Sequence, residues 1–233
     1  MDHGKPIIYV KNVRKVYRMG DEEVVALKRI NLRIYKGEVC CIFGTSGSGK
    51  STLLNQLAGM EKPTKGQVFI RGKNISDMNE EELAAFRQEH MSFIFQSYNL
   101  LPSMTAVENV AMPLMFKGMD RKRREAMAEE MLKRVGLSHR LHHYPSQMSG
   151  GTQQRAGIAR AFVSRPEVVF ADEPTGNLDT KTTAEIMDMV MGFARRFNQT
   201  IILVTHDPGM SRYADRIVTL VDGIITGDER KGQ

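Results

Sequence analysis

Residues 44–51, with the sequence GTSGSGKS, match the phosphate-binding pattern G-x-x-x-x-G-K-[ST] in full. The pattern follows an apolar segment and runs into a helical pattern at residues 51–57, so backbone N–H groups and a helix N-terminus can converge on phosphate oxygens. Lys50 supplies charge to the β- and γ-phosphates, and the Ser51 hydroxyl is a hard oxygen ligand for Mg²⁺. These residues predict a site for a nucleoside triphosphate with Mg²⁺.

An acidic pair, Asp172 and Glu173, ends a second apolar segment at residues 168–171. A Mg²⁺ site needs a further anchor, and Asp172 can hold the water shell of the metal. Side chains alternate along a strand, so Glu173 points elsewhere and can orient and deprotonate an attacking water. Without the phosphate loop, an exposed Asp-Glu turn would be the preferred interpretation, because apolar strands commonly end in acids.

A third group, Ser149-Gly150-Gly151, opens an apolar helical periodicity at residues 158–162. It is a second helix N-terminus suited to an anion, although no strand leads into it. A plain helix cap at Ser149 would not need two glycines behind it. One polypeptide would therefore carry two phosphate-recognising faces of different design.

The segments that must position these groups are strand-rich at first, mainly helical in the middle, and alternate between strand and helix at the end. Strand patterns occupy residues 7–13, 26–35, 38–43, 66–71, 167–171 and 200–205, and helical patterns occupy residues 51–57, 105–136 and 182–197. A final hairpin is expected to turn at Asp222-Gly223. The alternation in the last third predicts an α/β fold.

Composition restricts the classes of protein further. With 233 residues, of which 41% are hydrophobic, the chain can bury a core without disulfides or structural metals, and its apolar runs are too short to cross a membrane. The first residues lack the pattern of a secretory signal, so a cytoplasmic location is expected.

Adjacent Cys40 and Cys41 are interpreted as buried thiols. The net charge of +6 favours an anionic partner, but the basic run at residues 121–124 lacks interleaved aromatics and favours a solvated helix face over nucleic-acid binding.

Together, these motifs resemble the ABC transporter ATPase family over residues 9–227. Besides the three groups above, the family pattern finds Gln96, Asn177-Leu178-Asp179 and His206, all in the family's order. The resemblance implies one domain, an α/β fold with a P-loop NTPase core and a mainly parallel central sheet. An N-terminal antiparallel β subdomain belongs to that core, at about residues 1–95 and 165–233, and a helical subdomain with the Ser149 motif is inserted at about residues 97–163.

The resemblance also implies roles for single residues. Tyr17 would stack on adenine, Gln96 would sense the γ-phosphate and the metal, and His206 would contact the γ-phosphate and hold Glu173 in place. Taken alone, each of these three could be an ordinary structural residue. The nucleotide would be bound by Tyr17, Gly44, Thr45, Ser46, Gly47, Ser48, Gly49, Lys50, Ser51, Thr52, Ser149, Gly150, Gly151 and Asp179. Mg²⁺ would be held by Ser51, Gln96 and Asp172, and the catalytic residues would be Glu173, His206 and Gln96.

In this family the Ser149 motif of one subunit caps the ATP of another, so the resemblance implies a head-to-tail, ATP-dependent homodimer. A separate transmembrane permease would convert closure into work, and the chain would lie on the inner face of a prokaryotic cell membrane through that partner. Met148 and Thr152 depart from the commonest signature, Leu-Ser-Gly-Gly-Gln, but keep an apolar anchor and a hydroxyl.

Residues 93–96, 100–102, 105–110 and 171–179 resemble the branch that contains macrolide exporters, lipoprotein-release complexes, antimicrobial-peptide-resistance exporters and a cell-division ATPase. A non-transport role in cell division differs only by partner, so it stays an alternative. A DNA-repair ATPase would carry long insertions, and a kinase would lack the Ser149 motif and His206. A GTPase would show a guanine-reading Asn-Lys-x-Asp segment, which is missing from the sequence.

Overall fold

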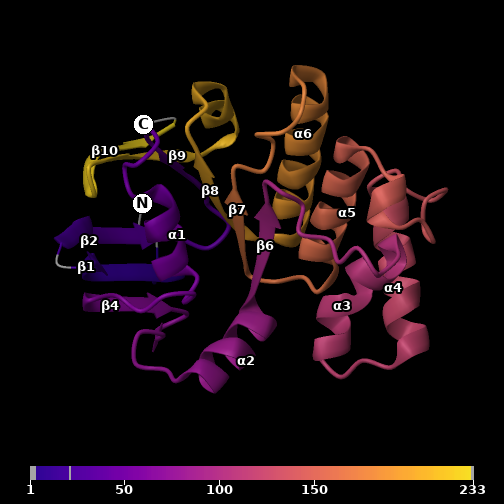
Figure 1. Cartoon of the computed structure of the whole chain (residues 1–233), viewed down its shortest axis with the longest axis horizontal. Helices are drawn as coiled ribbons and strands as arrows, with labels where there is room; N and C mark the ends of the chain where they lie inside the picture. Colours follow the sequence, from indigo (N-terminus) through magenta and orange to yellow (C-terminus); the bar gives the residue numbers. More distant parts are fainter. Residues whose placement is uncertain (1–3, 21, 232–233) are drawn as a thin grey trace. The chain divides into compact units, whose positions relative to one another are not determined.

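The structure, a computed structural model, describes residues 4–20 and 22–231. The chain divides into two units, one built from the chain before Gln88 and after Phe197, and the other from Gln88–Phe197 (Figure 1). The division falls within helix α2 (Glu80–His90) and just after helix α6 (Thr180–Phe197). The boundaries predicted near residues 97 and 163 are those of the helical subdomain that the family resemblance implies. They differ from this division and stay a prediction.

An antiparallel sheet begins the first unit. Its strands are β1 (Ile8–Met19), β2 (Glu22–Ile34), β4 (Lys65–Ile70) and β5 (Lys73–Asn74), in the order β2-β1-β4-β5. Along the second half of β2 every other residue is buried, ending with Ile30, Leu32 and Ile34, because successive side chains of a strand point to opposite faces. The predicted N-terminal antiparallel region is therefore confirmed.

The first unit also contains parallel strands that lead into the functional loops. Strand β3 (Val39–Phe43) pairs in parallel with β8 (Thr200–Thr205) and with β9 (Arg216–Val221), and β10 (Ile224–Arg230) pairs antiparallel with β9. Helix α1 (Lys50–Leu57) follows β3, and a short 3-10 helix, η2 (Pro208–Tyr213), follows β8. Both thiols of β3, Cys40 and Cys41, are buried as predicted. The predicted hairpin is confirmed, with left-handed backbone at Asp222 and Gly223.

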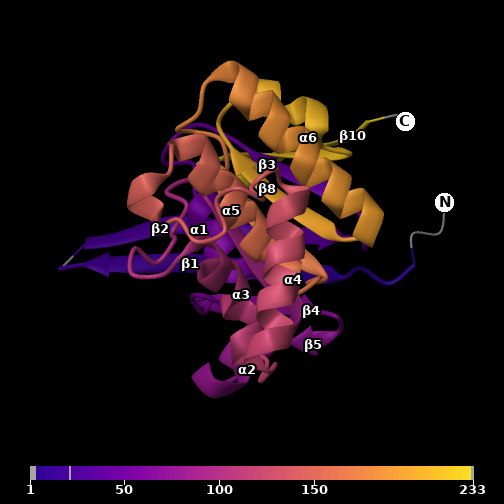
Figure 2. The same ribbon diagram turned by 90° about the vertical axis from the view of Figure 1, so that its right-hand side faces the viewer.

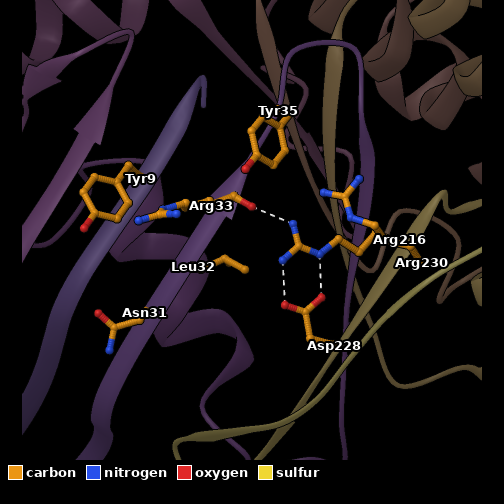
Figure 3. A pocket seen from close by; sticks show the side chains of 8 residues that line it. All are labelled: Tyr9, Asn31, Leu32, Arg33, Tyr35, Arg216, Asp228 and Arg230. Atoms are coloured by element: carbon orange, nitrogen blue, oxygen red, sulfur yellow. Dashed lines mark hydrogen bonds and ion pairs between the residues drawn. The ribbon is translucent and has the colours of Figure 1, made fainter. Parts of the chain in front are cut away.

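Buried Arg216 connects three strands of the first unit (Figure 3). Its guanidinium donates two hydrogen bonds to Asp228 of β10, at 2.5 and 2.6 Å, and one to the backbone oxygen of Arg33 in β2, at 2.6 Å. The bidentate bond to Asp228 raises the pKa of Arg216 above its ordinary value. Beside this group lies a cavity of about 430 Å³, where the guanidiniums of Arg33 and Arg230 lie over the rings of Tyr9 and Tyr35.

The second unit combines two parallel strands with four helices. Strand β6 (Met91–Phe95) pairs with β7 (Val168–Asp172), and the helices are α3 (Ala106–Phe116), α4 (Arg121–Arg134), α5 (Gly150–Val163) and α6. A 3-10 helix, η1 (Pro145–Gln147), precedes α5. Helices α3, α4 and α5 pack against one another, and both views show α3 beside α4 (Figures 1 and 2). The ring centroids of Phe162 in α5 and Phe193 in α6 lie 5.2 Å apart in the buried core.

The helical region predicted at residues 105–136 consists of two helices. Thr105 and Glu108 form a capping box that starts α3, and Gly118, with a φ of 73°, lies in the turn that follows. Asp120 caps α4, which begins at Arg121, and the exposed start of α4 fits the predicted solvated helix face. In the part of the chain that the structure describes, no helix has the length and apolarity needed to span a membrane.

Candidate active site

The phosphate loop lies between β3 and α1, as the sequence predicts. Gly49 precedes α1 with a φ of 99°, and a Cβ atom there would lie 2.7 Å from the backbone oxygen of Ala26, so this position accepts only glycine. Helix α1 has no side-chain cap and no acidic residue in its first turn. Its first N–H groups and its positive dipole end are therefore suited to an anion from outside the helix.

Lys50 and Ser48 give this loop its charge and polarity. Lys50 is only 7% exposed, and its Nζ donates a 2.7 Å hydrogen bond to the backbone oxygen of Thr45 in the same loop. The hydroxyl of Ser48 is buried and has no hydrogen-bond partner among the described residues. The N–H of Gly223 donates to the backbone oxygen of Ser48 at 3.0 Å, so the β9–β10 turn supports the loop. A buried cation, an unpaired hydroxyl and an uncapped helix fit a triphosphate.

His206 follows β8 at the same edge of the sheet at which the phosphate loop follows β3. Phe43 of β3 pairs in parallel register with Thr205 of β8, so the residues that follow both strands emerge together. The Thr205 hydroxyl accepts a 3.0 Å hydrogen bond from the N–H of Asp207, which caps η2. These contacts fix the backbone on either side of His206, whose side chain is exposed.

Tyr17 of β1 is fixed by contacts that the sequence did not reveal. Its hydroxyl donates a 2.7 Å hydrogen bond to Glu61, and the ammonium of Lys15 lies 5.1 Å from its ring centroid. Lys15 also forms a 3.1 Å ion pair with Glu61. Burial, together with the bond to the Glu61 carboxylate, raises the pKa of Tyr17 above its ordinary value. The ring orientation is thus set by a charged pair rather than by packing alone.

In the second unit, Gln96 and Glu173 emerge from the same edge of paired strands. Phe95 pairs with Asp172 in the parallel register of β6 and β7, so the next residue of each chain segment lies at that edge. Strand β7 ends at Asp172, and Glu173 has a φ of 43°, which is unusual for a residue with a side chain. The direction of the Glu173 side chain is therefore set by this left-handed turn and not by strand alternation. Such backbone strain costs about 1–3 kcal/mol and is typical of functional sites.

Asp179 begins α6. Its carboxylate accepts hydrogen bonds from the N–H of Thr182 at 3.0 Å, from the Thr182 hydroxyl at 2.6 Å, and from the N–H of Lys181 at 3.1 Å. The bonds from Thr182 hold the pKa of Asp179 below its usual value. The structure thus gives Asp179 a helix-capping role that the sequence analysis did not assign, and its nucleotide contact stays a prediction.

Ser149 directly precedes α5 and caps it. Its hydroxyl lies 2.9 Å from the Thr152 hydroxyl and 3.4 Å from the Thr152 N–H, which donates to it. Met148 is buried, which confirms its interpretation as an apolar anchor. The Ser149 side chain is exposed, and the first turn of α5 carries no acidic residue. This helix start therefore combines a serine cap with a surface that an anion can approach.

A magnesium ion of the predicted kind needs few protein ligands. Across residues 4–20 and 22–231, no three His, Cys, Asp or Glu side chains gather into a metal-binding cluster. Mg²⁺ keeps several waters and takes one or two carboxylates together with substrate phosphates, so it requires no such cluster. The hard oxygens of Ser51, Gln96 and Asp172 fit this chemistry, with Ser51 exposed in the first turn of α1 and the other two half-buried.

The predicted residues are distributed over both units. The first unit carries Tyr17, the phosphate loop through Thr52, and His206, and the second carries Gln96, Ser149, Gly150, Gly151, Asp172, Glu173 and Asp179. Sequence reasoning missed Glu61 beside Tyr17, and it missed the buried amide of Gln154. The one signal for Gln154 in the sequence is its position one turn after the two glycines that open the helix.

Comparisons with known proteins agree with this geometry. The family described as ABC transporter matches residues 27–176. The uncharacterized ABC transporter ATP-binding protein MJ1508 of Methanocaldococcus jannaschii is 48% identical over 219 residues, which cover 94% of this chain and 97% of that protein. The macrolide export ATP-binding/permease protein MacB of Shewanella sp. (strain ANA-3) is 46% identical over 225 residues. Those residues cover 97% of this chain but 34% of MacB, so the chain spans about a third of that relative.

The solved dimeric structure of the ATP-binding cassette MJ0796, in a post-hydrolysis state bound to ADP and Pi, has the same fold. It matches with a TM-score of 0.89 and 42% identity, and the match covers 96% of this chain and 98% of that one. The expected fold class is confirmed. With the phosphate loop, the acidic strand end and the glycine-opened helix in place, the chain belongs to the ABC transporter family, as an ATP-binding and ATP-hydrolysing cassette.

Proposed function

We propose that two copies of this chain close head to tail around two ATP molecules, and that hydrolysis reopens the dimer to drive a separate transmembrane permease. The observation that carries this proposal is that one chain has two anion-suited helix starts of different design. Helix α1 has no cap of its own, whereas α5 is capped by Ser149. A nucleotide gripped by α1 of one subunit and covered by α5 of the other would make ATP part of the interface. The dimeric form of MJ0796 supports such an assembly.

In the proposed site, each side chain has one task. Lys50 and the N–H groups of α1 bind the phosphate chain, and Ser51, Gln96 and Asp172 supply oxygen ligands for Mg²⁺. Mg²⁺, when bound, neutralises charge on the β- and γ-phosphates. Glu173 orients the attacking water and accepts its proton, while His206 contacts the γ-phosphate. The left-handed backbone of Glu173 supports its assignment as the general base.

The proposed adenine contact predicts a graded response at Tyr17. Tyr17→Ala removes the ring and should weaken ATP binding by about 1–3 kcal/mol, the usual contribution of base stacking, or roughly 5- to 150-fold in Kd. Tyr17→Phe keeps the ring but loses the bond to Glu61, so we expect its Kd to stay within about 3-fold of the native value. Calorimetric titration with ATP measures both. Equal Kd values for Tyr17→Ala and the native chain would remove the stacking role.

A partner surface is supported by the second unit. Phe116 is 61% exposed, and Leu101 and Met115 are each 39% exposed. Met115 also lines a cavity of about 250 Å³, together with Met104 and Met112 and with charged residues of α4. Methionine-rich apolar surface of this kind adapts to a protein partner. MacB is named as an ATP-binding/permease protein, which supports a permease partner here and a place on the inner face of the membrane. Export, extraction or mechanotransmission fits this partner, and nucleic acid is not expected.

Mixing two inactive variants tests the composite site. Lys50→Ala removes the phosphate grip of its own subunit, and Ser149→Arg blocks the surface that covers the other subunit's ATP. In a head-to-tail heterodimer, one of the two sites then contains both intact parts, so the mixture should recover hydrolysis that neither variant shows alone. Steady-state phosphate release measures the recovery.

The matched control mixes Lys50→Ala with Glu173→Gln. Both changes affect parts that a subunit contributes to its own nucleotide, so every site in the heterodimer is defective and hydrolysis should stay at background. Recovery in this control, or no recovery in the Lys50→Ala and Ser149→Arg mixture, would reject the head-to-tail arrangement. The permease itself is best identified by co-purification from native membranes.

A further inference from the structure

The buried side chain of Gln154 connects two loops that carry predicted catalytic residues. Gln154 lies in α5 with 0% exposure. Its amide nitrogen donates one hydrogen bond to the backbone oxygen of Phe95, at 3.4 Å, and another to the backbone oxygen of Pro174. Phe95 directly precedes Gln96, and Pro174 directly follows Glu173. One NH₂ group therefore uses its two hydrogens to join the ends of β6 and β7.

This arrangement leaves the other half of the amide unsatisfied. The side-chain oxygen of Gln154 is buried and has no hydrogen-bond partner in the described part of the chain. A buried polar atom without a partner lowers stability, and an apolar side chain of similar size would avoid that loss. We therefore attribute the glutamine at this position to its NH₂ group and the two hydrogen bonds that this group donates. Turning the amide over would place its oxygen against two carbonyl oxygens, so the observed orientation is the favourable one.

A second amide fixes Gln96 from the other side. The nitrogen of Asn177 donates to the backbone oxygen of Gln96 at 3.2 Å, and the Gln96 side chain donates back to the Asn177 oxygen at 3.4 Å. A Cβ atom on Gly176 would lie 2.7 Å from the Gln96 amide nitrogen, so the side chain packs directly against the glycine backbone. Gln96 is thus held by the segment that begins at Glu173.

Helix α5 also restrains the backbone after Gln96. Tyr98 and Asn99 both have left-handed backbone, with φ of 62° and 47°. The guanidinium of Arg160, buried in α5, donates to the backbone oxygens of Tyr98 at 2.8 Å and Asn99 at 2.5 Å. Strained segments persist only where surrounding contacts determine them, and α5 supplies those contacts.

We propose that Gln154 and Asn177 are positioning residues for ATP hydrolysis. They fix the backbone beside Gln96 and beside Glu173 as one unit, so that the two catalytic side chains keep their mutual geometry. This inference rests on the roles proposed above for Gln96 as a ligand of Mg²⁺ and for Glu173 as the general base. Small displacements of reacting groups have large effects on rate and small effects on substrate binding, which gives the proposal a kinetic signature.

Gln154→Met tests the proposal, because methionine keeps the length and flexibility of glutamine but donates no hydrogen bond. We expect kcat for ATP hydrolysis to fall by about 10- to 100-fold, with the Kd for ATP within about 3-fold of the native value. The matched control is Gln153→Met, the same change one residue earlier, where the native amide donates to the backbone oxygen of Met148, just before its own helix. Its kcat should stay within about 2-fold of native.

Two further variants keep the test decisive. Asn177→Ala, at an exposed position, should lower kcat with unchanged ATP affinity even if Gln154→Met folds poorly. Adding Gln154→Met to Glu173→Gln should lower the residual kcat by less than about 3-fold, because one of the two side chains that Gln154 positions is then already inactive. A folded Gln154→Met chain with native kcat, or equal losses in kcat and ATP affinity, would overturn the proposal. If Glu173→Gln itself kept native kcat, the proposed catalytic role would fail instead.

Discussion

Glu173→Gln is expected to lower kcat for ATP hydrolysis by about 10²- to 10⁴-fold, the usual contribution of a general base. Glutamine keeps the shape of glutamate but cannot accept the proton of the attacking water at neutral pH. The phosphate loop is untouched, so ATP should still bind, and the chain should accumulate as an ATP-dependent dimer because reopening requires hydrolysis. Phosphate release and light scattering at saturating ATP measure the two effects.

A suitable control is Glu185→Gln, which removes an exposed carboxylate from the same unit. Glu185 forms a 2.6 Å ion pair with Arg155, and ion pairs of this kind contribute about 0–1 kcal/mol. Its kcat should therefore equal that of the native chain. Rapid hydrolysis by Glu173→Gln would assign the base to another residue, and a monomer at saturating ATP would argue against interface closure.

Lys50→Ala is expected to weaken ATP binding itself. The ammonium contributes charge-assisted hydrogen bonds to phosphate, each about 1.5–3 kcal/mol, so even one such bond corresponds to a loss of roughly 10- to 150-fold in affinity. Lys50 also donates to Thr45 within the loop, so the variant loses a local contact as well. Calorimetric titration with ATP and Mg²⁺ gives the affinity, and thermal unfolding separates the loss of binding from a loss of folding.

Exposed Lys36, in the turn before β3, provides the comparison for this experiment. Lys36→Ala removes the same charge from the same unit, so its ATP affinity should change little if the effect of Lys50 is local rather than a matter of net charge. Identical titrations for native and Lys50→Ala chains would refute the assignment of residues 44–51 as the phosphate loop.

Much of the fold could be predicted because local patterns and tertiary packing agree. The strand before Gly44 and the helix after Gly49 follow from a short apolar run and the glycines, and the Asp222-Gly223 turn follows from the preference for left-handed backbone. Helix α2 was missed, although Asn79 and Glu82 exchange hydrogen bonds at its start at 2.8 and 2.9 Å. That capping box was visible in the sequence, but few apolar residues follow it.

The interior of the candidate site could not be predicted in the same way. The left-handed backbone of Glu173 goes against residue preference, and only neighbouring contacts make it stable. The two hydrogen bonds of Gln154 join segments 59 and 20 residues away along the chain, so no local pattern announces them. The sequence identifies which side chains do chemistry, whereas the groups that orient them depend on tertiary contacts.

The two adjacent thiols of β3 have a practical consequence. Burial raises the pKa of Cys41 to about 11 and also raises that of Cys40. Thiolate is the form that attacks maleimides and disulfides, so near pH 7 the folded native chain should not react with such reagents. A cysteine engineered at the surface, for example in place of Ser149, would then be the one position that takes a fluorescent or spin label. The native protein, treated with the same reagent, would be the unlabelled control.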